Sequence, residues 1–257
     1  MGSWSGADVR RVAADWVWVP DGSRRVDRDY RLIGYPSWTS IAPQVSAVDS
    51  DRPAAAIADE AAAQARSWEA DKLGWWINAA TRPADLVQEL RSRGAEHADT
   101  VDVLALNLDR ELPDFGPMPG ISAERVTTVE QFRDADVVNV AVWGQEPLSE
   151  ERLREQVTNE TPTGDIRVIA RLDGRPVASG GCTVVDGVAR LWGAATVEAA
   201  RGRGAYRAVL GLRLRLARDA GATLALVKGR AGTSAPILKR IGFTEYGQEH
   251  IYELPLN

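Results

Sequence analysis

Sulfur and imidazole ligands are scarce in this chain. Its 257 residues contain one cysteine, Cys182, and two histidines, His97 and His250. A single thiol excludes a disulfide within the chain. Two distant histidines and one cysteine also provide too few side chains for a His/Cys metal cluster. We therefore expect no metal and no structural role for oxidation, which is consistent with a cytoplasmic location.

Long apolar runs and an excess of basic residues are also missing. No apolar run approaches the length of a membrane span, and residues 1–11 lack the apolar core of a signal peptide. The 31 Lys and Arg are outnumbered by 36 Asp and Glu, which gives a net charge of -5. Because nucleic-acid-binding surfaces usually show a basic excess, we expect neither a nucleic acid nor a membrane as partner. The sequence carries no signal for an oligomeric state.

Proline and glycine mark one break in the chain. Residues 112–120 contain three prolines and two glycines, which disfavours both helix and strand. The hydrophobic fraction of the whole chain, 44%, is enough for packed cores. We therefore predict an N-terminal domain over residues 1–112, a linker over residues 113–120 and a second domain over residues 121–257.

The second domain begins as an antiparallel meander. Asp173-Gly174 and Asp186-Gly187 separate three apolar segments, and Asp-Gly favours the positive φ angles of tight hairpin turns. The predicted strands are residues 121–126, 167–171, 177–185 and 188–197, and the predicted helices between the first two are residues 129–141 and 149–157. We expect the three strands between residues 167 and 197 to pair in antiparallel fashion.

A helical pattern follows the meander. Val209, Leu212 and Leu216 form an apolar stripe within residues 205–220, and a buried strand is predicted over residues 223–227. A strand, helix and strand in this order form a parallel crossover. A short helix over residues 234–240 and a closing strand over residues 251–254 complete the domain. The predicted fold class is α+β, with a mixed, mostly antiparallel sheet flanked by helices.

The first half resembles a degenerate copy of the second. Leu90 lies four residues before Gly94, as Leu238 lies four before Gly242, and each glycine is followed twelve residues later by another leucine. The strand at residues 75–77 would then match the strand at residues 224–227. The Ala-rich residues 53–66 are predicted to form a helix. The alternative is that both halves merely end in an ordinary helix followed by a strand. The first half has no glycine-rich loop, so a repeat would have lost that chemistry.

The loop over residues 197–206 lies between a predicted strand and a predicted helix. Gly202 and Gly204 allow backbone N–H groups to turn toward an anion, and the helix N-terminus adds a partial positive charge. Three other interpretations compete with this one: a tight turn only, a dinucleotide fingerprint and a Walker-type phosphate loop. The fingerprint would need glycine where Arg207 stands, and no Gly-Lys-Ser/Thr follows for a Walker loop.

Two motifs resemble those of the GNAT superfamily of acetyltransferases. Residues 201–206, Arg-Gly-Arg-Gly-Ala-Tyr, look like its R-x-x-G-x-G/A signature, and residues 234–243, which end in Gly-Phe, look like its second motif. The resemblance covers about residues 121–257. The two-half arrangement is similar to that of tandem GNAT proteins with a degenerate N-terminal half.

The resemblance implies the donor and the reaction. Backbone N–H groups of residues 203–206 would hold the pyrophosphate of acetyl-CoA, the strand end at residues 196–197 would pair with its pantetheine arm, and a backbone N–H near Val197 would serve the oxyanion. The implied cofactor-binding residues are Thr196, Val197, Arg201, Gly202, Arg203, Gly204, Ala205 and Tyr206. The implied reaction is direct attack of an amine on the thioester.

The sequence departs from the family where acid and base groups are usual. Tyr206 replaces the usual Gly or Ala, and the places of the usual Asn, phenol acid and Glu base hold Ala231, Leu238 and Arg190. For catalysis we name Ser234 near the expected thioester and His250 in the closing strand.

The predicted function is transfer of an acetyl or other acyl group from acyl-CoA to a primary amine of a small molecule. The alternatives are a non-catalytic acyl-CoA-binding or regulatory module and a protein N-acyltransferase.

Overall fold

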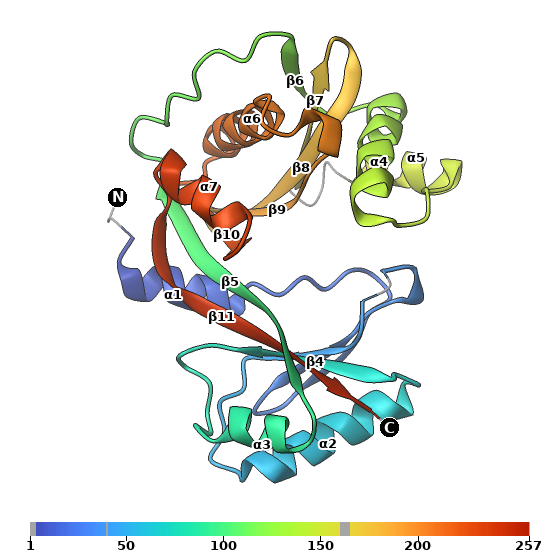
Figure 1. Cartoon of the computed structure of the whole chain (residues 1–257), viewed down its shortest axis with the longest axis vertical. Coiled ribbons are helices and arrows are strands. Elements are labelled where there is room, and N and C mark those ends of the chain that lie inside the picture. Colours follow the sequence, from blue (N-terminus) through green and yellow to red (C-terminus); the bar gives the residue numbers. More distant parts are fainter. Residues whose placement is uncertain (1–3, 40, 160–164, 257) are drawn as a thin grey trace. The chain divides into compact units, whose positions relative to one another are not determined.

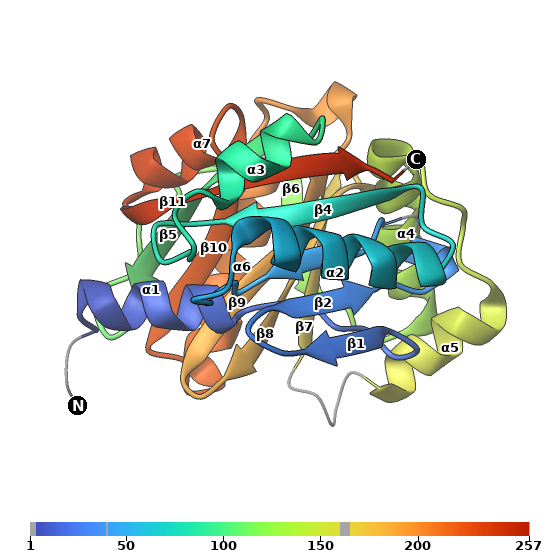
Figure 2. The same cartoon turned by 90° about the horizontal axis from the view of Figure 1, so that it is seen from below.

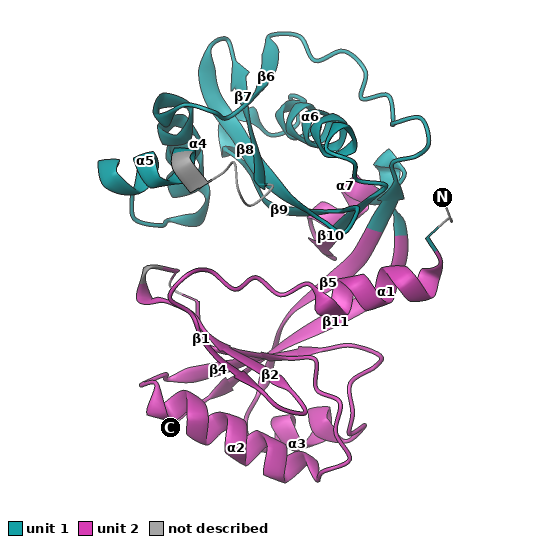
Figure 3. Cartoon of the chain, turned by 180° about the vertical axis from the view of Figure 1, so that it is seen from behind, with its two compact units in different colours: residues 1–4, 105–227, 239–244 teal, residues 5–104, 228–238, 245–257 magenta. Residues whose placement is uncertain are grey.

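The computed structural model describes residues 4–39, 41–159 and 165–256, and these divide into two compact units (Figures 1 and 3). Among these residues, unit 1 contains Trp4 and residues 105–159, 165–227 and 239–244, and unit 2 contains residues 5–39, 41–104, 228–238 and 245–256. Each unit therefore takes segments from both halves of the sequence.

These units differ from the predicted domains. The closing strand, β11 (Thr244–Pro255), joins unit 2 from Glu245 onward, where it pairs antiparallel with β4 (Lys72–Ile77). Tyr252 and Leu254 of β11 are buried in the unit 2 core. The predicted boundaries 1–112 and 121–257 follow chain order, whereas this apolar strand is buried beside the first half. The predicted linker, residues 113–120, belongs to unit 1.

Unit 1 is built on the predicted meander. The strands β6 (Ile121–Arg125), β7 (Asp165–Leu172), β8 (Arg175–Val185) and β9 (Val188–Thr196) pair antiparallel in this order. Both Asp-Gly turns adopt positive φ, with 51° and 83° at residues 173 and 174 and 50° and 75° at residues 186 and 187. The next strand, β10 (Leu224–Arg230), pairs parallel with β9. The meander and the parallel crossover are thus confirmed.

Helices cover both faces of the unit 1 sheet. They are α4 (Val129–Trp143), α5 (Glu150–Asn159) and α6 (Ala205–Asp219). Ser179 Oγ on β8 donates a hydrogen bond to Asn139 Oδ1 of α4 over 2.9 Å, whereas the next residue, Gly180, faces Arg213 of α6. Because neighbouring residues of a strand point to opposite faces, α4 and α6 pack on opposite sides of β8 (Figure 1).

Unit 2 contains most of the first half of the chain. Its further elements are α1 (Gly6–Asp15), β1 (Arg24–Asp27), β2 (Arg31–Gly34), a 3-10 turn (Ser37–Thr39), β3 (Gln44–Ser46), α2 (Ala54–Ser67), α3 (Leu86–Ser92) and β5 (Glu96–Asn107). The strand order is β1-β2-β3-β4-β11-β5. The helices α2 and α3 lie side by side against this sheet (Figure 2). The alanine-rich face of α2, which includes Ile57, is buried in the unit 2 core together with Leu86 and Leu90 of α3.

The two halves repeat the same closing elements. In the first half, β4 is followed by α3, Gly94 and β5; in the second, β10 is followed by α7 (Ser234–Ile241), Gly242 and β11. Both glycines have positive φ, 90° and 114°. Both closing strands are twelve residues long. The segment before α2, residues 47–53, contains no glycine. The structure therefore supports a related first half without the glycine-rich loop.

Candidate functional site

The loop between β9 and α6 is held in a glycine-dependent turn. A 3-10 turn (Glu198–Ala200) follows β9, and α6 begins at Ala205 with Gly204 as its N-cap. Gly202 has a φ of 76° and Gly204 a φ of 94°. Both values lie in the left-handed region, which costs other residues about 1–2 kcal/mol. The glycines are thus required by the turn itself.

This loop leaves backbone donors at the start of α6. The first N–H groups of any α-helix lack partners within the helix, and here Ala208 N donates to Gly204 O over 3.0 Å. The N–H groups of residues 205–207 precede this first bond, at the positive end of the helix dipole. The side chains of Arg201 and Arg203 are exposed beside them. This arrangement suits a phosphate or pyrophosphate.

The predicted linker packs against the same end of α6. A Cβ on Gly204 would lie 2.9 Å from Met118 Cγ, and one on Gly211 would lie 3.0 Å from Phe115 Cδ2. Arg207 Nη1 also donates to the carbonyl of Phe115 over 3.0 Å. Gly204 and Gly211 therefore permit close approach of the linker to α6. Gly204 is in addition required by the turn before the helix.

The edge of β9 before the loop is irregular. Its parallel pairing with β10 runs only from Val188 to Arg190 among the described residues. On the other side Trp192 is opposite Gly181 and Ala195 is opposite Ser179, so Gly193 and Ala194 together face Gly180. This is a β-bulge, in which one residue is left unpaired. Gly193 has a φ of 61°.

The backbone N–H of Val197 itself is already bonded, and the predicted oxyanion donor near Val197 stays a prediction. The Val197 N–H donates to Val177 O over 2.9 Å, which continues the β8–β9 ladder beyond Thr196. An N–H used in this way cannot stabilise an oxyanion. Because the bulge leaves an unpaired residue earlier on the same strand, the bulge is the better location for an oxyanion donor.

A buried cation lies behind the bulge. Arg213 on α6 is 1% exposed and donates from Nη1 to Gly181 O over 3.0 Å and to Trp192 O over 3.3 Å. Burial lowers the pKa of Arg213, and the neighbouring Tyr206 hydroxyl acts in the opposite direction. Burial also raises the pKa of Tyr206. The Tyr206 side chain is therefore part of the packing beneath the loop, and only its backbone remains for an anion.

Comparison with solved structures identifies this arrangement. A GCN5-related N-acetyltransferase from Kribbella flavida superposes with a TM-score of 0.71 at 20% identity over 96% of this chain and 95% of that chain. One from Sphaerobacter thermophilus gives 0.66 at 16% identity over 84% and 72%. The chain has the GNAT fold. A tandem GNAT protein from the clavulanic acid biosynthesis pathway gives 0.61 at 16% identity over 89% and 78%, which supports the two-part arrangement.

The sequence alone makes no such match. No protein-family model and no curated protein matches it. The GNAT fold is therefore established here by structure, and the loop of residues 197–206 occupies the turn between β9 and α6 within that fold.

The two predicted catalytic residues lie in unit 2, whereas the loop lies in unit 1. Ser234 opens α7 and is half-buried. His250 Nδ1 on β11 lies 3.1 Å from Thr100 Oγ1, which in turn lies 2.9 Å from His97 Nε2. The structure thus gives His250 a hydroxyl neighbour and a second histidine in reach of the same hydroxyl. Their roles in catalysis stay predictions.

A buried ion pair in unit 2 had no sequence signal. Lys228 Nζ lies 2.9 Å from Glu249 Oε2, and the Glu249 side chain is 5% exposed. The same ammonium lies 5.1 Å from the centre of the Trp76 ring. Lys228 directly follows the part of β10 that belongs to unit 1. Glu249 stands between Gln248 and His250, and Lys228 ends an apolar run, so the sequence does not indicate that the two side chains meet.

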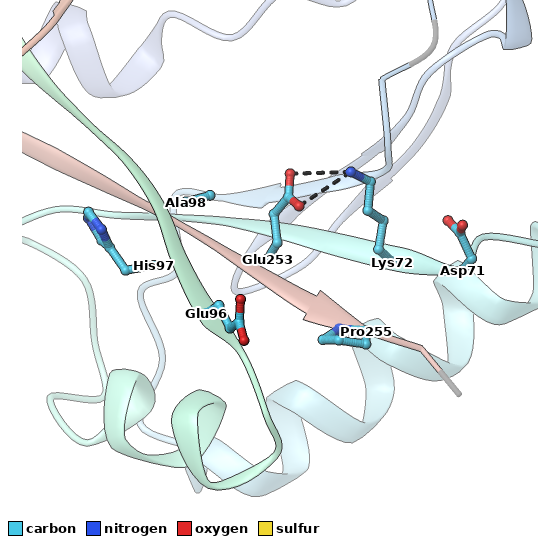
Figure 4. Close-up of a pocket in the computed structure, with 7 residues that line it drawn as sticks. All are labelled: Asp71, Lys72, Glu96, His97, Ala98, Glu253 and Pro255. Atoms are coloured by element: carbon cyan, nitrogen blue, oxygen red, sulfur yellow. Dashed lines mark hydrogen bonds and ion pairs between the residues drawn. The ribbon is translucent and has the colours of Figure 1, made fainter. Parts of the chain in front are cut away.

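A hollow of about 400 Å³ opens on unit 2 (Figure 4). Its lining is Asp71, Lys72, Glu96, His97, Ala98, Glu253 and Pro255. Lys72 and Glu253 form an exposed ion pair of 3.3 Å across it. None of the predicted site residues lines this hollow, and its acidic side chains do not assemble into a ligand set.

Within the described part of the chain, no three His, Cys, Asp or Glu side chains are grouped so as to hold a metal ion. No helix described in either unit combines the length and apolarity of a membrane span.

Proposed function

We propose that this protein is an acetyl-CoA-dependent N-acyltransferase that acylates a primary amine of a small molecule. The observation that carries the proposal is the loop of residues 201–206, because its left-handed glycines lead into the N-terminus of α6, whose first N–H groups have no partner within the helix, in a GNAT fold. A pyrophosphate is the part of CoA that such a helix N-terminus would bind.

The donor would lie along the end of β9. Of the predicted N–H groups of residues 203–206, Arg203 N already donates to Ala200 O over 3.4 Å. The pyrophosphate would therefore contact the N–H groups at the start of α6 from residue 204 onward, with the side chains of Arg201 and Arg203 adding formal charge. The pantetheine arm of the donor would run beside residues 196–197 as an added strand, where β9 extends beyond its pairing with β10. In this arrangement the thioester of the donor would lie toward the bulge of β9.

The proposed reaction is a direct acyl transfer. An uncharged amine attacks the thioester carbonyl, a C–N bond forms and the C–S bond breaks. The proton that the attacking nitrogen then loses balances the proton that the CoA thiolate gains. An amine that arrives as an ammonium first gives one further proton to the base, which passes it to solvent. Holding the two reactants together lowers the barrier by several kcal/mol. His250 is our candidate for the base and Ser234 for a hydrogen bond to the leaving sulfur. An unpaired N–H at the bulge would stabilise the oxyanion.

A small molecule is the proposed acceptor class. The tandem GNAT neighbour is named for a biosynthesis pathway of a small molecule, and no basic surface excess favours a polymer of phosphates. The net charge of -5 would also suit a basic protein substrate, so basic peptides belong in the same assay.

One specific observation favours a second function. Arg190, Ala231 and Leu238 stand where the resemblance places the usual base, Asn and phenol acid, and Leu238 is fully buried. Without these groups the fold would bind acyl-CoA as a non-catalytic, regulatory module. Binding without turnover is the result that this alternative predicts.

The test combines binding and turnover. We expect calorimetry to show binding of CoA, and a thiol-release assay to show turnover of acetyl-CoA with at least one member of a panel of small amines. Turnover only with basic peptides would favour protein acylation. CoA binding with no thiol release from any acceptor would overturn the catalytic proposal in favour of the binding module.

A matched pair of variants tests the base. His250→Gln and His97→Gln alter two histidines that share Thr100 as neighbour. We expect His250→Gln to lower kcat at least tenfold, and His97→Gln to leave kcat within about twofold. Equal effects of the two variants would remove His250 from the mechanism.

A further inference from the structure

Arg213 is a fully buried arginine without a carboxylate partner. It is 1% exposed, and among the described residues no Asp or Glu forms an ion pair with it. Its Nε has no hydrogen-bond partner within the described structure. Burying a charge without a counterion is costly, and an apolar residue would continue the helix stripe at lower cost. A guanidinium retained here therefore needs a reason beyond packing.

The Arg213 guanidinium donates hydrogen bonds to both β8 and β9 beside the bulge. Its Nη1 donates to Gly181 O on β8 over 3.0 Å and to Trp192 O on β9 over 3.3 Å. These two residues form the last register pair before Gly193 and Ala194 open the bulge. Arg213 thus fixes the point on β9 at which the regular ladder stops.

Gly180 makes room for this contact. A Cβ on Gly180 would lie 3.1 Å from both Cζ and Nη1 of Arg213 and 3.2 Å from Val209 Cγ1. Gly180 is also the residue opposite the two bulged residues. The absence of a side chain at Gly180 therefore allows the Arg213 guanidinium to pack directly against the bulge.

The same side chain reaches the end of the phosphate loop. The Tyr206 hydroxyl interacts electrostatically with the Arg213 guanidinium. Tyr206 is the residue that departs from the Gly or Ala of the resembled signature. Arg213 consequently links the helix start that faces the pyrophosphate to the strand edge that faces the thioester.

We propose that Arg213 is a positioning residue for acyl transfer, which holds the β9 bulge, and with it the thioester carbonyl, in the reactive geometry. This inference rests on the proposed function and adds a residue to it. Arg213 touches neither substrate, because it is buried behind the strand. A misplacement of about 1 Å at a reacting group can cost on the order of a hundredfold in rate.

The experiment compares four variants for kcat, KM for acetyl-CoA, calorimetric affinity for CoA and melting temperature. Arg213→Met removes the charge, and Arg213→Lys keeps the charge but loses the forked donor. Gly180→Ala crowds the guanidinium without removing it. Arg215→Met is the matched control, since Arg215 is an exposed arginine on the same helix.

We expect Arg213→Met to lower kcat about tenfold to a hundredfold while KM and CoA affinity stay within about threefold. Arg213→Lys should fall between Arg213→Met and the wild type, Gly180→Ala should lower kcat in the same direction, and Arg215→Met should match the wild type. Should Arg213→Met fail to fold, Gly180→Ala and Arg213→Lys still decide the question.

Three results would overturn the inference. They are a kcat within twofold of wild type in Arg213→Met, an unchanged kcat in Gly180→Ala, and a loss confined to CoA affinity. Failure of the proposed function is distinguishable, because it shows as a wild-type protein that turns over no acceptor.

Discussion

Replacing Gly204 by alanine tests the geometry of the phosphate loop. Gly204 combines a φ of 94° with a space in which a Cβ would lie 2.9 Å from Met118 Cγ and 3.3 Å from Arg207 Nη2. The left-handed φ costs a non-glycine residue about 1–2 kcal/mol, and overpacking adds about 1–3 kcal/mol. We therefore expect Gly204→Ala to lower the free energy of unfolding by about 2–5 kcal/mol.

Gly202 supplies the matched control. Its φ is 76°, but a Cβ there would meet nothing within 4 Å. Gly202→Ala should therefore cost only the backbone component, about 1–2 kcal/mol. The difference between the two variants isolates the contact with Met118, and adding Met118→Ala to Gly204→Ala should recover that difference.

The assay is urea unfolding together with calorimetric titration of CoA. If the strained loop moves to relieve the contact, the N–H groups of residues 205–207 turn away from the pyrophosphate, and we expect CoA affinity to fall at least tenfold in Gly204→Ala. Equal stability of wild type and Gly204→Ala, or equal losses in Gly202→Ala and Gly204→Ala, would refute the described geometry of this turn.

Two further predictions concern titratable groups. The Tyr30 hydroxyl, with Arg52 and Arg28, lowers the pKa of Glu60 to about 2. A carboxylate whose pKa is lower in the folded than in the unfolded state stabilises the fold above its unfolded pKa, and this stabilisation is lost as the pH falls. In urea unfolding, the stability advantage of wild type over Glu60→Gln should therefore shrink from pH 4.5 to about pH 2. An unchanged advantage over that window would contradict this account. Burial raises the pKa of Cys182 to about 11, and the residue is fully buried. A colorimetric thiol reagent at pH 8 should therefore label it only after denaturation, and rapid stoichiometric labelling of the native protein would disprove the described packing.

Local signals in the sequence were enough for the elements that surround the loop. Asp-Gly pairs favour the positive φ angles of tight hairpin turns, so both hairpins of the meander were predictable. The stripe of Val209, Leu212 and Leu216 specified α6 because helix periodicity is a local property. The glycine-rich loop between strand and helix followed from these two predictions.

Short strands and long-range pairings left no comparable signal. The strands β1 and β2 have four residues each and β3 has three, which is too short for a period of two to stand out. The pairing of β11 with β4 joins residues far apart in the chain, and chain order alone places β11 with the second half. The predicted domain boundaries differ from the compact units for that reason.

The buried cation illustrates a different limit. Arg213 lies four residues after Val209 and three before Leu216, so it stands on the apolar stripe of α6. An arginine on an apolar stripe is a visible departure from the helical pattern. Its position pointed inward, but its partners, two backbone carbonyls at a bulge, depend on a register break that the sequence does not display.

The most direct test of the phosphate loop compares calorimetric affinities for CoA and for pantetheine. Pantetheine keeps the thiol and the amide arm but lacks the pyrophosphate and nucleotide. We predict that the wild type binds CoA at least a hundredfold more tightly than pantetheine, and that this preference falls at least tenfold in Gly204→Ala and weakens at high salt. Equal affinity of the wild type for both ligands, or no affinity for CoA, would contradict the assignment of residues 201–206 as the pyrophosphate site.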